Sequence, residues 1–530
     1  MSAVTGAPVL LRAELRHDGR SFAPWILITT ALSASSVLVY PWIFPDVSDR
    51  LALSTAIGAN PALGLIFGPA FDLTTTDGFN AWRSLALGGF LAGLGAIFAV
   101  TRATRGQEDS GQAELLASGV LGRSARLLSG VGLALVGSLL LGVVAGVVTG
   151  LCGGGWPASM LLGASFTATG WMFSGVAAVA AQLGGDPRTA SSIAVGALGV
   201  LFVLRGFAYS LQGPDWTVWA NPLGWMTETR PANGDDWWPL LLAVALTILL
   251  LVVAFVLQAR RDFGQGAIAP RPGPARGRMR SPLALAVRIN RGPVLTWAIA
   301  ALALGSVFGY FARSISSVLE SNDAVQQILA AGAASQDDLI SAFLVTILSL
   351  AGIILAIPGV QTMLKVRGEE LNDRVEPVIA TRVARSRYYG ANALVAFLAP
   401  TVYVLLAGVV LAALASTADI GVGFGQVLLQ AIATVPAVWT VIGVSVAVVG
   451  VRPAVGLAAW LGVLAAFVLT LLGPTFKLWD WILAISPFWH VPNVTDASPD
   501  WMGLVWISLV TLLFLVVGFA GFRRRDLAVS

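Results

Sequence analysis

Long apolar stretches alternate with short polar ones along the whole chain. An apolar run of about 20 residues is long enough to cross a bilayer as a helix, and we count about twelve such runs. The pattern therefore predicts an all-α, polytopic membrane protein. The predicted spans cover residues 23–44, 82–101, 127–150, 157–183, 189–211, 239–258, 294–316, 341–364, 391–416, 424–450, 454–473 and 503–522.

The second half of the chain repeats the first at an offset of 262 to 265 residues. The clearest copies are two polar islands, residues 105–124 and 367–386, which align without a gap. Six spans in each half give both copies the same orientation, so we predict parallel six-helix repeats related by an axis along the membrane normal. The identical pairs in the islands are Arg105/Arg367, Gly106/Gly368, Glu108/Glu370, Glu114/Glu376, Arg123/Arg385 and Ser124/Ser386.

Three segments follow from the repeat. Residues 1–262 form the first six-span half, residues 283–530 form the second, and the Pro-, Gly- and Arg-rich residues 263–282 form a flexible cytosolic linker. Residues 8–21 mix leucine with arginine and predict an amphipathic helix on the membrane surface, which residues 283–293 repeat. Basic residues gather in the islands, in the linker and at the ends of spans 6 and 12. The positive-inside rule therefore places these parts and both termini in the cytosol, with the plasma membrane as the expected location.

Composition agrees with this assignment. The chain is 56% hydrophobic and 11% charged, with a mean hydropathy of +0.81, whereas a soluble domain carries about 25% charged residues. The net charge of +4 is explained by the cytosolic basic residues, so no nucleic-acid partner is predicted. Cys152 is the only cysteine, which excludes an intramolecular disulfide and disfavours a thiol-based metal site.

The motifs of common catalytic sites are missing. The sequence has no phosphate-binding loop, and its only lysines are Lys365 and Lys477. His17 and His490 are the only histidines and are predicted on opposite faces of the membrane, which excludes a histidine-based metal site or proton relay. The acidic outer loops are more typical of solvated loops than of catalytic ones. We therefore predict no catalytic residue, no metal and no bound cofactor, and hence a protein that is not itself an enzyme.

The islands are the strongest candidates for a functional site. The first carries Glu108, Gly111 and Glu114 at a spacing of three residues, followed by Leu-Leu-Ala-Ser and then Arg123. Ser110 or Asp109 can cap a short helix, and the acidic residues in its first turn suit the helix dipole. Such a helix could dock on a partner, and the repetition of the glutamate spacing favours this over a solvated connecting loop. In the second island, Pro377 suits the first turn of a helix.

Ionisable residues are nearly absent from the spans. Arg205, in span 5, is the exception, and an arginine within a membrane is functional by default. However, it lies close enough to the outer end of the span for its side chain to reach the surface. We expect this snorkelling in preference to contact with a substrate. No buried carboxylate or histidine relay of the kind that a proton-coupled carrier uses is visible in the spans.

The pattern E-x-x-G-x-x-E-L-L-A-S…R after span 2 resembles the cytosolic coupling-helix region of ABC type-2 exporter permeases. The duplicated halves, the segments rich in Trp and Pro before spans 6 and 12 and the Arg-Arg-Asp endings resemble one branch of that family, the fused twelve-span permeases of actinobacteria described as exporters of polyketide antibiotics (the tetronasin type). The resemblance covers nearly the whole chain and implies the ABC type-2 exporter fold. It also implies that each island docks on one subunit of a homodimeric ATPase. The coupling residues that it indicates are Arg105, Glu108, Gly111, Glu114, Leu115, Arg123, Arg367, Glu370, Glu376 and Arg385.

The second island departs from the family pattern, with Asp373 and Pro377 in place of Gly111 and Leu115, so the halves are expected to couple unequally. The resemblance further implies short re-entrant helices at the outer face, an assignment compatible with interfacial anchoring of their tryptophans. Their candidate residues are Trp216, Pro222, Trp225, Trp481, Pro487 and Trp489. It also implies a central cavity lined by spans 2, 5, 8 and 11, although aromatic side chains in spans more often pack against neighbours or lipid. The candidate pathway residues are Phe90, Phe98, Phe202, Arg205, Phe207, Tyr209, Phe343, Trp460 and Phe467.

The sequence thus predicts the permease subunit of an ATP-driven exporter, with ATP and magnesium held by the partner ATPase. Because the spans offer little charge to an ionic solute, the expected cargo is an apolar or amphipathic small molecule such as a drug or a polyketide. An ABC exporter of a lipid or a cell-wall precursor stays open as an alternative. A proton-driven carrier of the major facilitator type would need a buried titratable residue in its spans. A membrane-embedded enzyme that uses outer-loop carboxylates is disfavoured by the close internal repeat.

Overall fold

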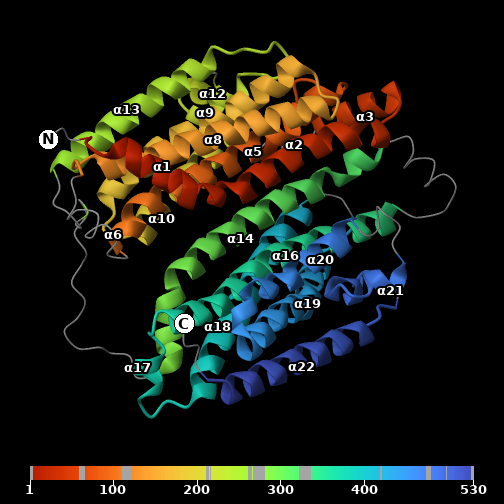
Figure 1. The fold of residues 1–530 in the computed structure, drawn as a ribbon. Coiled ribbons are helices and arrows are strands. Elements are labelled where there is room, and N and C mark those ends of the chain that lie inside the picture. Colours follow the sequence, from red (N-terminus) through yellow and green to blue (C-terminus); the bar gives the residue numbers. More distant parts are fainter. Residues whose placement is uncertain are drawn as a thin grey trace. The chain divides into compact units, whose positions relative to one another are not determined.

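The chain folds into two compact helical units, Met1–Gly273 and Pro274–Ser530, which we describe separately. All regular elements in the described residues are helices, and twelve of them are long and apolar enough to cross a membrane. The prediction of an all-α, polytopic membrane protein is therefore confirmed. The computed structural model describes residues 4–58, 66–109, 121–210, 214, 216–260, 266, 281–320, 336–417, 421–472, 479–496 and 498–526 (Figure 1).

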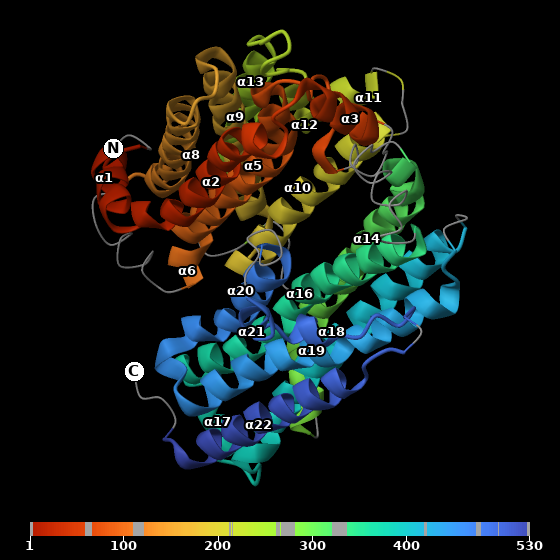
Figure 2. The same cartoon turned by 90° about the vertical axis from the view of Figure 1, so that its right-hand side faces the viewer.

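The first unit contains six candidate spans and several short helices. Figure 2 shows α1 and α6 at one end of this unit and α3 and α11 at the other. The helices that contribute the spans are α2 (Ala23–Ile43), α5 (Thr76–Thr101), α8 (Ala125–Leu151), α9 (Trp156–Leu183), α10 (Pro187–Ser210) and α13 (Pro239–Arg260). The shorter elements are α1 (Ala7–His17), η1 (Gly19–Phe22), α3 (Val47–Gly58), the π-helix η2 (Arg102–Gly106), α6 (Gln107–Asp109), α11 (Trp216–Trp219) and α12 (Pro222–Thr227).

The second unit repeats this order with longer helices. Figure 1 shows α17 at one end of the unit and α21 at the other. Five of its spans belong to α14 (Pro282–Glu320), α16 (Gln336–Leu371), α18 (Arg385–Ala415), α19 (Phe424–Val451) and α22 (Met502–Arg524). The eleventh is broken into a 3-10 helix (Pro453–Trp460), α20 (Leu461–Phe467) and a π-helix (Val468–Leu472), and the short helices are α17 (Glu376–Ile379), α21 (Asp480–Leu483) and η5 (Pro487–His490).

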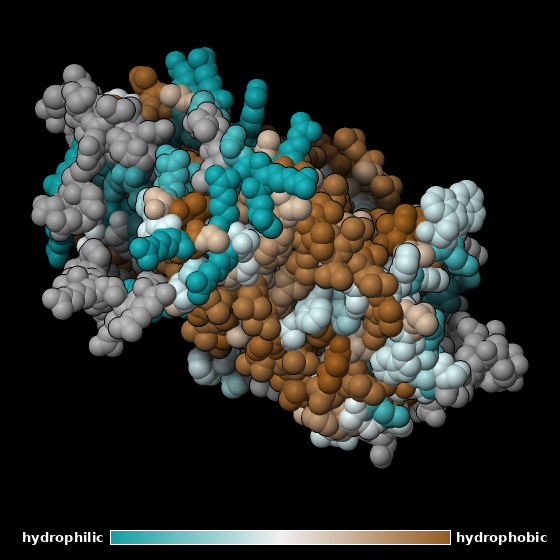
Figure 3. Space-filling view, turned by 90° about the horizontal axis from the view of Figure 1, so that it is seen from below, coloured by the Kyte–Doolittle hydropathy of each residue, from teal (hydrophilic) through white to brown (hydrophobic). Residues whose placement is uncertain are grey.

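One helix forms the centre of each unit. In the first unit α9 packs against α5, α8 and α13, and in the second unit the corresponding α19 packs against α16, α18 and α22. The most apolar stretch of α9 is 78% buried, whereas those of α13 and α22 are 17% buried. Ala, Gly, Ser and Thr on α9 allow close helix packing, while α13 and α22 present large apolar side chains outward. On the face seen in Figure 3, a broad apolar surface has hydrophilic side chains gathered toward one end.

The two units differ from the prediction at their first spans. A separate surface helix was expected before each, but only α1 is separate, because α14 continues through residues 282–293 into its span. Pro293 lies inside α14 and has no N–H to donate to the backbone oxygen of Ile289. Lys365 of α16 donates to that oxygen instead, at 3.1 Å. The helix therefore persists where the sequence predicted a boundary.

Candidate functional site

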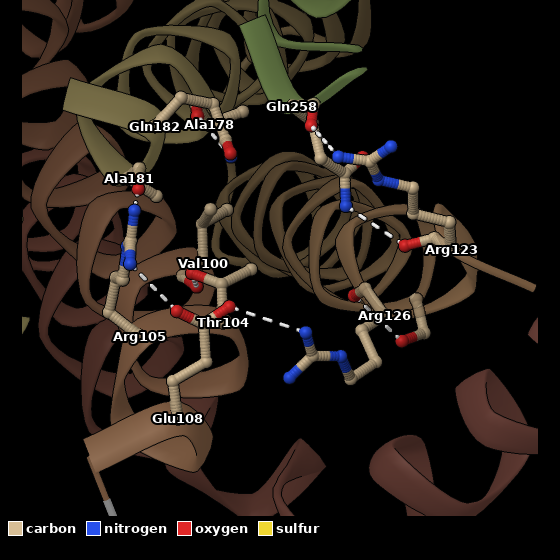
Figure 4. Close-up of polar contacts among 11 residues, drawn as sticks. Val100, Thr104, Arg105, Glu108, Arg123, Arg126, Ala178, Ala181, Gln182 and Gln258 are labelled. Atoms are coloured by element: carbon tan, nitrogen blue, oxygen red, sulfur yellow. Dashed lines mark hydrogen bonds and ion pairs between the residues drawn. The ribbon is translucent and has the colours of Figure 1, made fainter. Parts of the chain in front are cut away.

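The first polar island begins on the helix of span 2 rather than after it. Past α5 the chain continues through η2 into α6, so Arg105 and Glu108 lie on one helical path. Arg105 is 1% exposed. Its Nε donates to the backbone oxygen of Ala181 on α9, and its Nη1 lies 2.7 Å from Glu108 Oε2 (Figure 4). The arginine therefore ties the end of span 2 to span 4.

Glu108 also connects span 2 to span 3. Its Oε1 lies 3.3 Å from Arg126 Nη2 at the start of α8, and its side chain is 8% exposed (Figure 4). A carboxylate removed from water needs such partners to stay charged. Glu108 has two arginine partners, which identifies it as an internal brace of the unit.

The surface helix α1 and Thr5, just before it, contact the two ends of the island. Glu14 Oε1 accepts hydrogen bonds from Gln107 Nε2 at 3.3 Å and from Ser129 Oγ of α8 at 3.2 Å. The backbone oxygen of Thr5 accepts from the N–H of Gly122 at 2.9 Å. Burial raises the pKa of Glu14 to about 7, against the lowering effect of the two side-chain hydrogen bonds. Residues 5–14 thus contact the chain at both Gln107 and Gly122.

The second island has a buried glutamate with a different partner. Glu370, at the end of α16, has a side chain that is 1% exposed, and its Oε1 lies 2.7 Å from Nη2 of Arg525. The Nε of Arg525 donates to the backbone oxygen of Gly450 on α19 at 3.0 Å. Its guanidinium carbon lies 4.9 Å from the centre of the Phe522 ring. Arg525 therefore joins the ends of spans 8, 10 and 12.

In both units, the start of the third span contacts the end of the sixth span. Arg123, just before α8, donates to the backbone oxygen of Gln258 on α13 at 3.3 Å, and Gln258 Nε2 returns a hydrogen bond to the Arg123 oxygen at 3.1 Å (Figure 4). Arg385, at the start of α18, donates to the backbone oxygen of Arg525 at 2.9 Å. In each half, the arginine that begins the third span is thus bound to the end of the sixth.

Between spans 8 and 9 the second island forms the short helix α17. Val375 is 1% exposed and anchors it to the core of the unit, and Val378 and Ile379 pack against the same core. Glu376 and Pro377 are exposed. Just before the helix, Asp373 has a φ of 54°, in the left-handed region that aspartate tolerates better than most residues. The helix therefore follows a buried anchor residue and has one half-buried and one exposed side.

At the other end of each unit, a short helix with a capped N-terminus follows the fifth span of that unit. These helices are α12 after span 5 and η5 after span 11. Pro222 begins α12 and Pro487 begins η5, and the preceding side chains Asn221 and Ser486 accept from the N–H groups of Leu223 and Phe488. Each capping residue also contacts the preceding span. Asn221 Nδ2 donates to the Leu201 oxygen at 2.8 Å, and Ser486 Oγ lies 2.9 Å from Thr470 Oγ1.

The chain after each capped helix returns to the central helix of its unit. In the first unit Ser165 Oγ on α9 lies 3.1 Å from Thr229 Oγ1. In the second unit Gln430 Oε1 on α19 accepts from the N–H of Val494 at 2.8 Å. Both pairs are related by an offset of 265 residues, so the internal repeat extends to single contacts. The outer tryptophans are mostly exposed, by 69% at Trp216, 66% at Trp481 and 50% at Trp489, while Trp225 donates to the backbone oxygen of Trp219.

The expectation that Arg205 reaches the surface is wrong. Its side chain is buried, and Nη2 donates to the backbone oxygen of Ile66 at 2.6 Å. The guanidinium carbon lies 4.8 Å from the centre of the Phe202 ring. The side chain does not extend to the surface because the Ile66 carbonyl oxygen, in the chain beside α10, accepts its hydrogen bond. One turn further along α10, Tyr209 donates to Glu228 Oε1 at 2.8 Å.

The remaining aromatic candidates fall into two groups. Phe90 and Phe202 pack edge to face, with ring centres 5.1 Å apart. The other pathway candidates are exposed in their units, as Phe98, Phe207 and Phe467 are, or half-buried, as Phe343 and Trp460 are. Within the described residues, no cluster of three or more metal-ligating side chains occurs.

Known proteins resemble the chain over nearly its full length. The sequence profile described as "Multidrug efflux system permease Rv1217c, C-terminal domain" matches residues 31–257 and 279–523, and thus most of both units. The chain is also 33% identical over 543 residues to the multidrug efflux system permease protein Rv1217c of Mycobacterium tuberculosis (strain ATCC 25618 / H37Rv). That match spans 99% of this chain and 96% of the relative. The chain belongs to this family of multidrug efflux system permeases.

Family membership confirms the resemblance to exporter permeases, and the chain is a multi-pass membrane permease. The assignment of the coupling residues stays a prediction. Arg105 and Glu370 are buried, the Glu108 side chain is 8% exposed, and all three bind residues of their own unit. Arg105 pairs with Glu108 three residues along the chain, whereas Glu370 pairs with Arg525, 155 positions away. Glu376 is exposed, and Gly111, Glu114 and Leu115 lie outside the described residues.

The other predicted coupling residues lie at the junctions between helices. Arg123 and Arg385 bind the ends of the sixth spans, as described above. Arg367 lies beside Gly456 of the broken span 11, where a Cβ would collide with its guanidinium. These arginines connect the islands to the spans.

Sequence reasoning missed one residue in each unit that connects its helices, Glu14 in the first and Lys365 in the second. A signal for Glu14 exists, because it is the one acidic residue on a helix that carries Arg12 and Arg16. A signal for Lys365 lies in Pro293, whose missing N–H leaves a carbonyl to be bound. Pairing either residue with its partner requires the tertiary structure.

Proposed function

We propose that this permease is the membrane-spanning subunit of an ATP-driven exporter, and that a separate dimeric ATPase drives it. The observation that carries the proposal is α17. This four-residue helix lies between two long spans, is anchored by Val375 and leaves Glu376 and Pro377 exposed. A short helix with one half-buried and one exposed side suits docking in a partner's cleft. The sequence itself lacks a phosphate-binding loop, which supports an external source of ATP hydrolysis.

The contacts around the islands can transmit a movement of the docked helix to the membrane spans. A push on α17 acts directly on the start of α18, where Arg385 binds the end of α22. Arg525 extends the connection to α16 and α19 through Glu370 and the Gly450 oxygen. Four spans of the unit are then moved together. In the first unit, Arg105, Glu108 and Arg123 connect spans 2, 3, 4 and 6 in a similar way.

The charged side chains in and beside the spans bind other groups of the protein, which supports an apolar or amphipathic cargo. Among the buried or half-buried cations of the spans, Arg205 and Lys365 bind backbone oxygens and Arg83 donates to Ser36 Oγ. The buried Glu370 binds Arg525. Such groups are held for structure rather than for an ionic solute. The related protein is named a multidrug efflux permease, which fits cargo of mixed, largely apolar chemistry. With the ATPase on the side of α17, export from the cytosol across the plasma membrane follows.

Affinity purification from the native membrane tests the proposal. We expect an ATPase with a phosphate-binding loop to co-purify at two copies per chain. Glu376→Arg reverses the exposed charge of α17 and should reduce the co-purified ATPase at least tenfold. Arg524→Glu, at an exposed position on α22, is the control and should retain it. If no nucleotide-binding subunit co-purifies with the folded wild type, the proposal is wrong.

A further inference from the structure

The first unit contains an apolar groove that the proposed function does not use. It lies between α8, α9 and α13 and has a volume of about 300 Å³. Its walls include Leu139 and Val143 of α8, Ala164 and Trp171 of α9 and Leu240 of α13. Pockets for apolar ligands start at about this volume and have similar linings.

Small residues create the groove. Gly142 on α8 lies so close to the Gly163 oxygen of α9 that a Cβ at either glycine would collide with the other helix. Beside this contact, Ala164 and Thr167 leave the space between the helices unfilled.

The repeat in the second unit does not preserve these small residues. At the offsets of the repeat, Gly142, Ala164 and Thr167 correspond to Val404, Leu429 and Ile432. All three replacements are larger apolar residues, and Val404 is buried while Leu429 and Ile432 are 42% and 47% exposed. The small residues that line the groove therefore belong to the first half only.

The shape of the groove indicates what occupies it. Along α9 it extends from Met160, near the start of the helix, to Trp171. At 1.5 Å per residue this is about 16 Å, which matches the depth of one leaflet, about 15 Å of a hydrocarbon core about 30 Å thick. Trp237, 51% exposed, lies at the end of the groove nearest the start of α13, and tryptophan favours the membrane–water interface.

We propose that this groove binds one acyl chain of a membrane phospholipid from the leaflet at the α12 end of the unit. The chain enters beneath Trp237 and extends along α9 as far as Trp171. An apolar groove that is one leaflet deep fits a hydrocarbon chain held parallel to the spans. The bound lipid then fills the gap between α8, α9 and α13.

Native mass spectrometry of the whole chain during graded delipidation tests this proposal. The filling variant is Ala164→Leu with Thr167→Ile, which introduces the residues of the second unit. The control is Val253→Leu, an exposed position on α13 nine residues beyond Val244 and so on the opposite side of that helix. We expect wild type and control to keep one more phospholipid per chain than the filling variant. Equal retention by all three proteins would overturn the proposal.

A second measurement does not require the filling variant to fold. Wild type and Trp171→Phe are reconstituted in vesicles of phosphatidylcholine with or without bromine on the acyl chains. Bromine quenches nearby tryptophan, so the difference between the two proteins reports on Trp171. We expect that component to be strongly quenched, and to recover if Thr167→Ile is added. A Trp171 component that brominated chains leave unchanged, or that only a lipophilic dye quenches, contradicts an acyl chain in the groove.

Discussion

Glu370 and Arg525 form a buried ion pair, with 2.7 Å between Oε1 and Nη2, although 155 positions separate them in the chain. The pair links the end of α16 to the residue that follows α22. Its counterpart in the first unit, Glu108, is neutralised by Arg105 and Arg126 instead. The equivalent glutamates of the two halves are thus neutralised by arginines at different positions of the repeat.

Removing Arg525 should destabilise the second unit strongly. Arg525→Ala leaves the Glu370 carboxylate buried without its cation, and breaking a buried pair in this way costs about 3–5 kcal/mol. Glu370→Gln in the same chain should recover part of the loss, because the buried charge disappears. Thermal unfolding in detergent measures both. Arg524→Ala, at the exposed neighbouring position, should be nearly neutral, and an equal loss there would contradict the pair's role.

The stability of the first unit should fall as the pH rises through the titration of Glu14. The folded pKa is about 7 against an ordinary value of 4.5, so the folded protein binds the proton more tightly than the unfolded chain. The contribution of Glu14 to the free energy of unfolding is thus complete below about pH 4.5 and is lost as the pH rises to about 7. A pKa shift of this size corresponds to a loss of about 3 kcal/mol.

Glu14→Gln removes this titration while keeping an oxygen acceptor for Gln107 and Ser129. We expect the variant to unfold at a higher temperature than wild type at pH 8 and at a similar temperature at pH 5. Asp109→Asn, at an exposed position, should keep the wild-type pH dependence. A Glu14→Gln profile parallel to that of wild type would show that burial does not raise this pKa.

Lys365 and Pro293 should show a positive coupling. Lys365→Met leaves the Ile289 oxygen without the ammonium that binds it, at a cost of about 1–3 kcal/mol. In a Pro293→Ala background, the new N–H can donate to that oxygen within the helix, so the same substitution should cost about 1 kcal/mol less. A double-mutant cycle of unfolding free energies measures the difference. Strict additivity would mean that the lysine acts elsewhere.

Close helix contact should make Gly142 intolerant of a side chain. Gly142→Ala places a methyl group against the Gly163 oxygen and Thr167 Oγ1, and overpacking of this kind costs about 1–3 kcal/mol or more. Gly196→Ala on α10 meets no atom within 4 Å and should be neutral or slightly stabilising, because alanine favours helix. Yield of monodisperse protein and apparent unfolding temperature distinguish the two variants.

Much of this architecture could be predicted because it is recorded in local patterns. The twelve apolar runs predict the spans, and the repeated islands predict two related halves. The burial of Arg105 could not be predicted, because it depends on Ala181 of a helix 76 positions away. Arg205 is a similar case, since its acceptor belongs to Ile66. A charged residue near the end of a span looks the same in sequence whether it faces water or a neighbouring helix.

The continuity of α14 shows a second limit. A proline in the first turns of a predicted span, with basic residues before it, is typical of a boundary between a surface helix and a span. Lys365 donates a hydrogen bond to the Ile289 oxygen, which Pro293 leaves without a backbone donor, so the helix can continue through this position. Its position is known only once α14 and α16 are packed together. Local signals therefore located the elements, while tertiary contacts decided where two of them merge.

The most direct test of the account is transport by the purified complex in proteoliposomes. The permease is reconstituted with its co-purified ATPase, and movement of a lipophilic fluorescent dye is followed with ATP, with a non-hydrolysable ATP analogue, or with an imposed proton gradient alone. The account predicts transport that requires ATP hydrolysis and that Glu376→Arg reduces at least tenfold while Arg524→Glu does not. Transport driven by the proton gradient without ATP would contradict it.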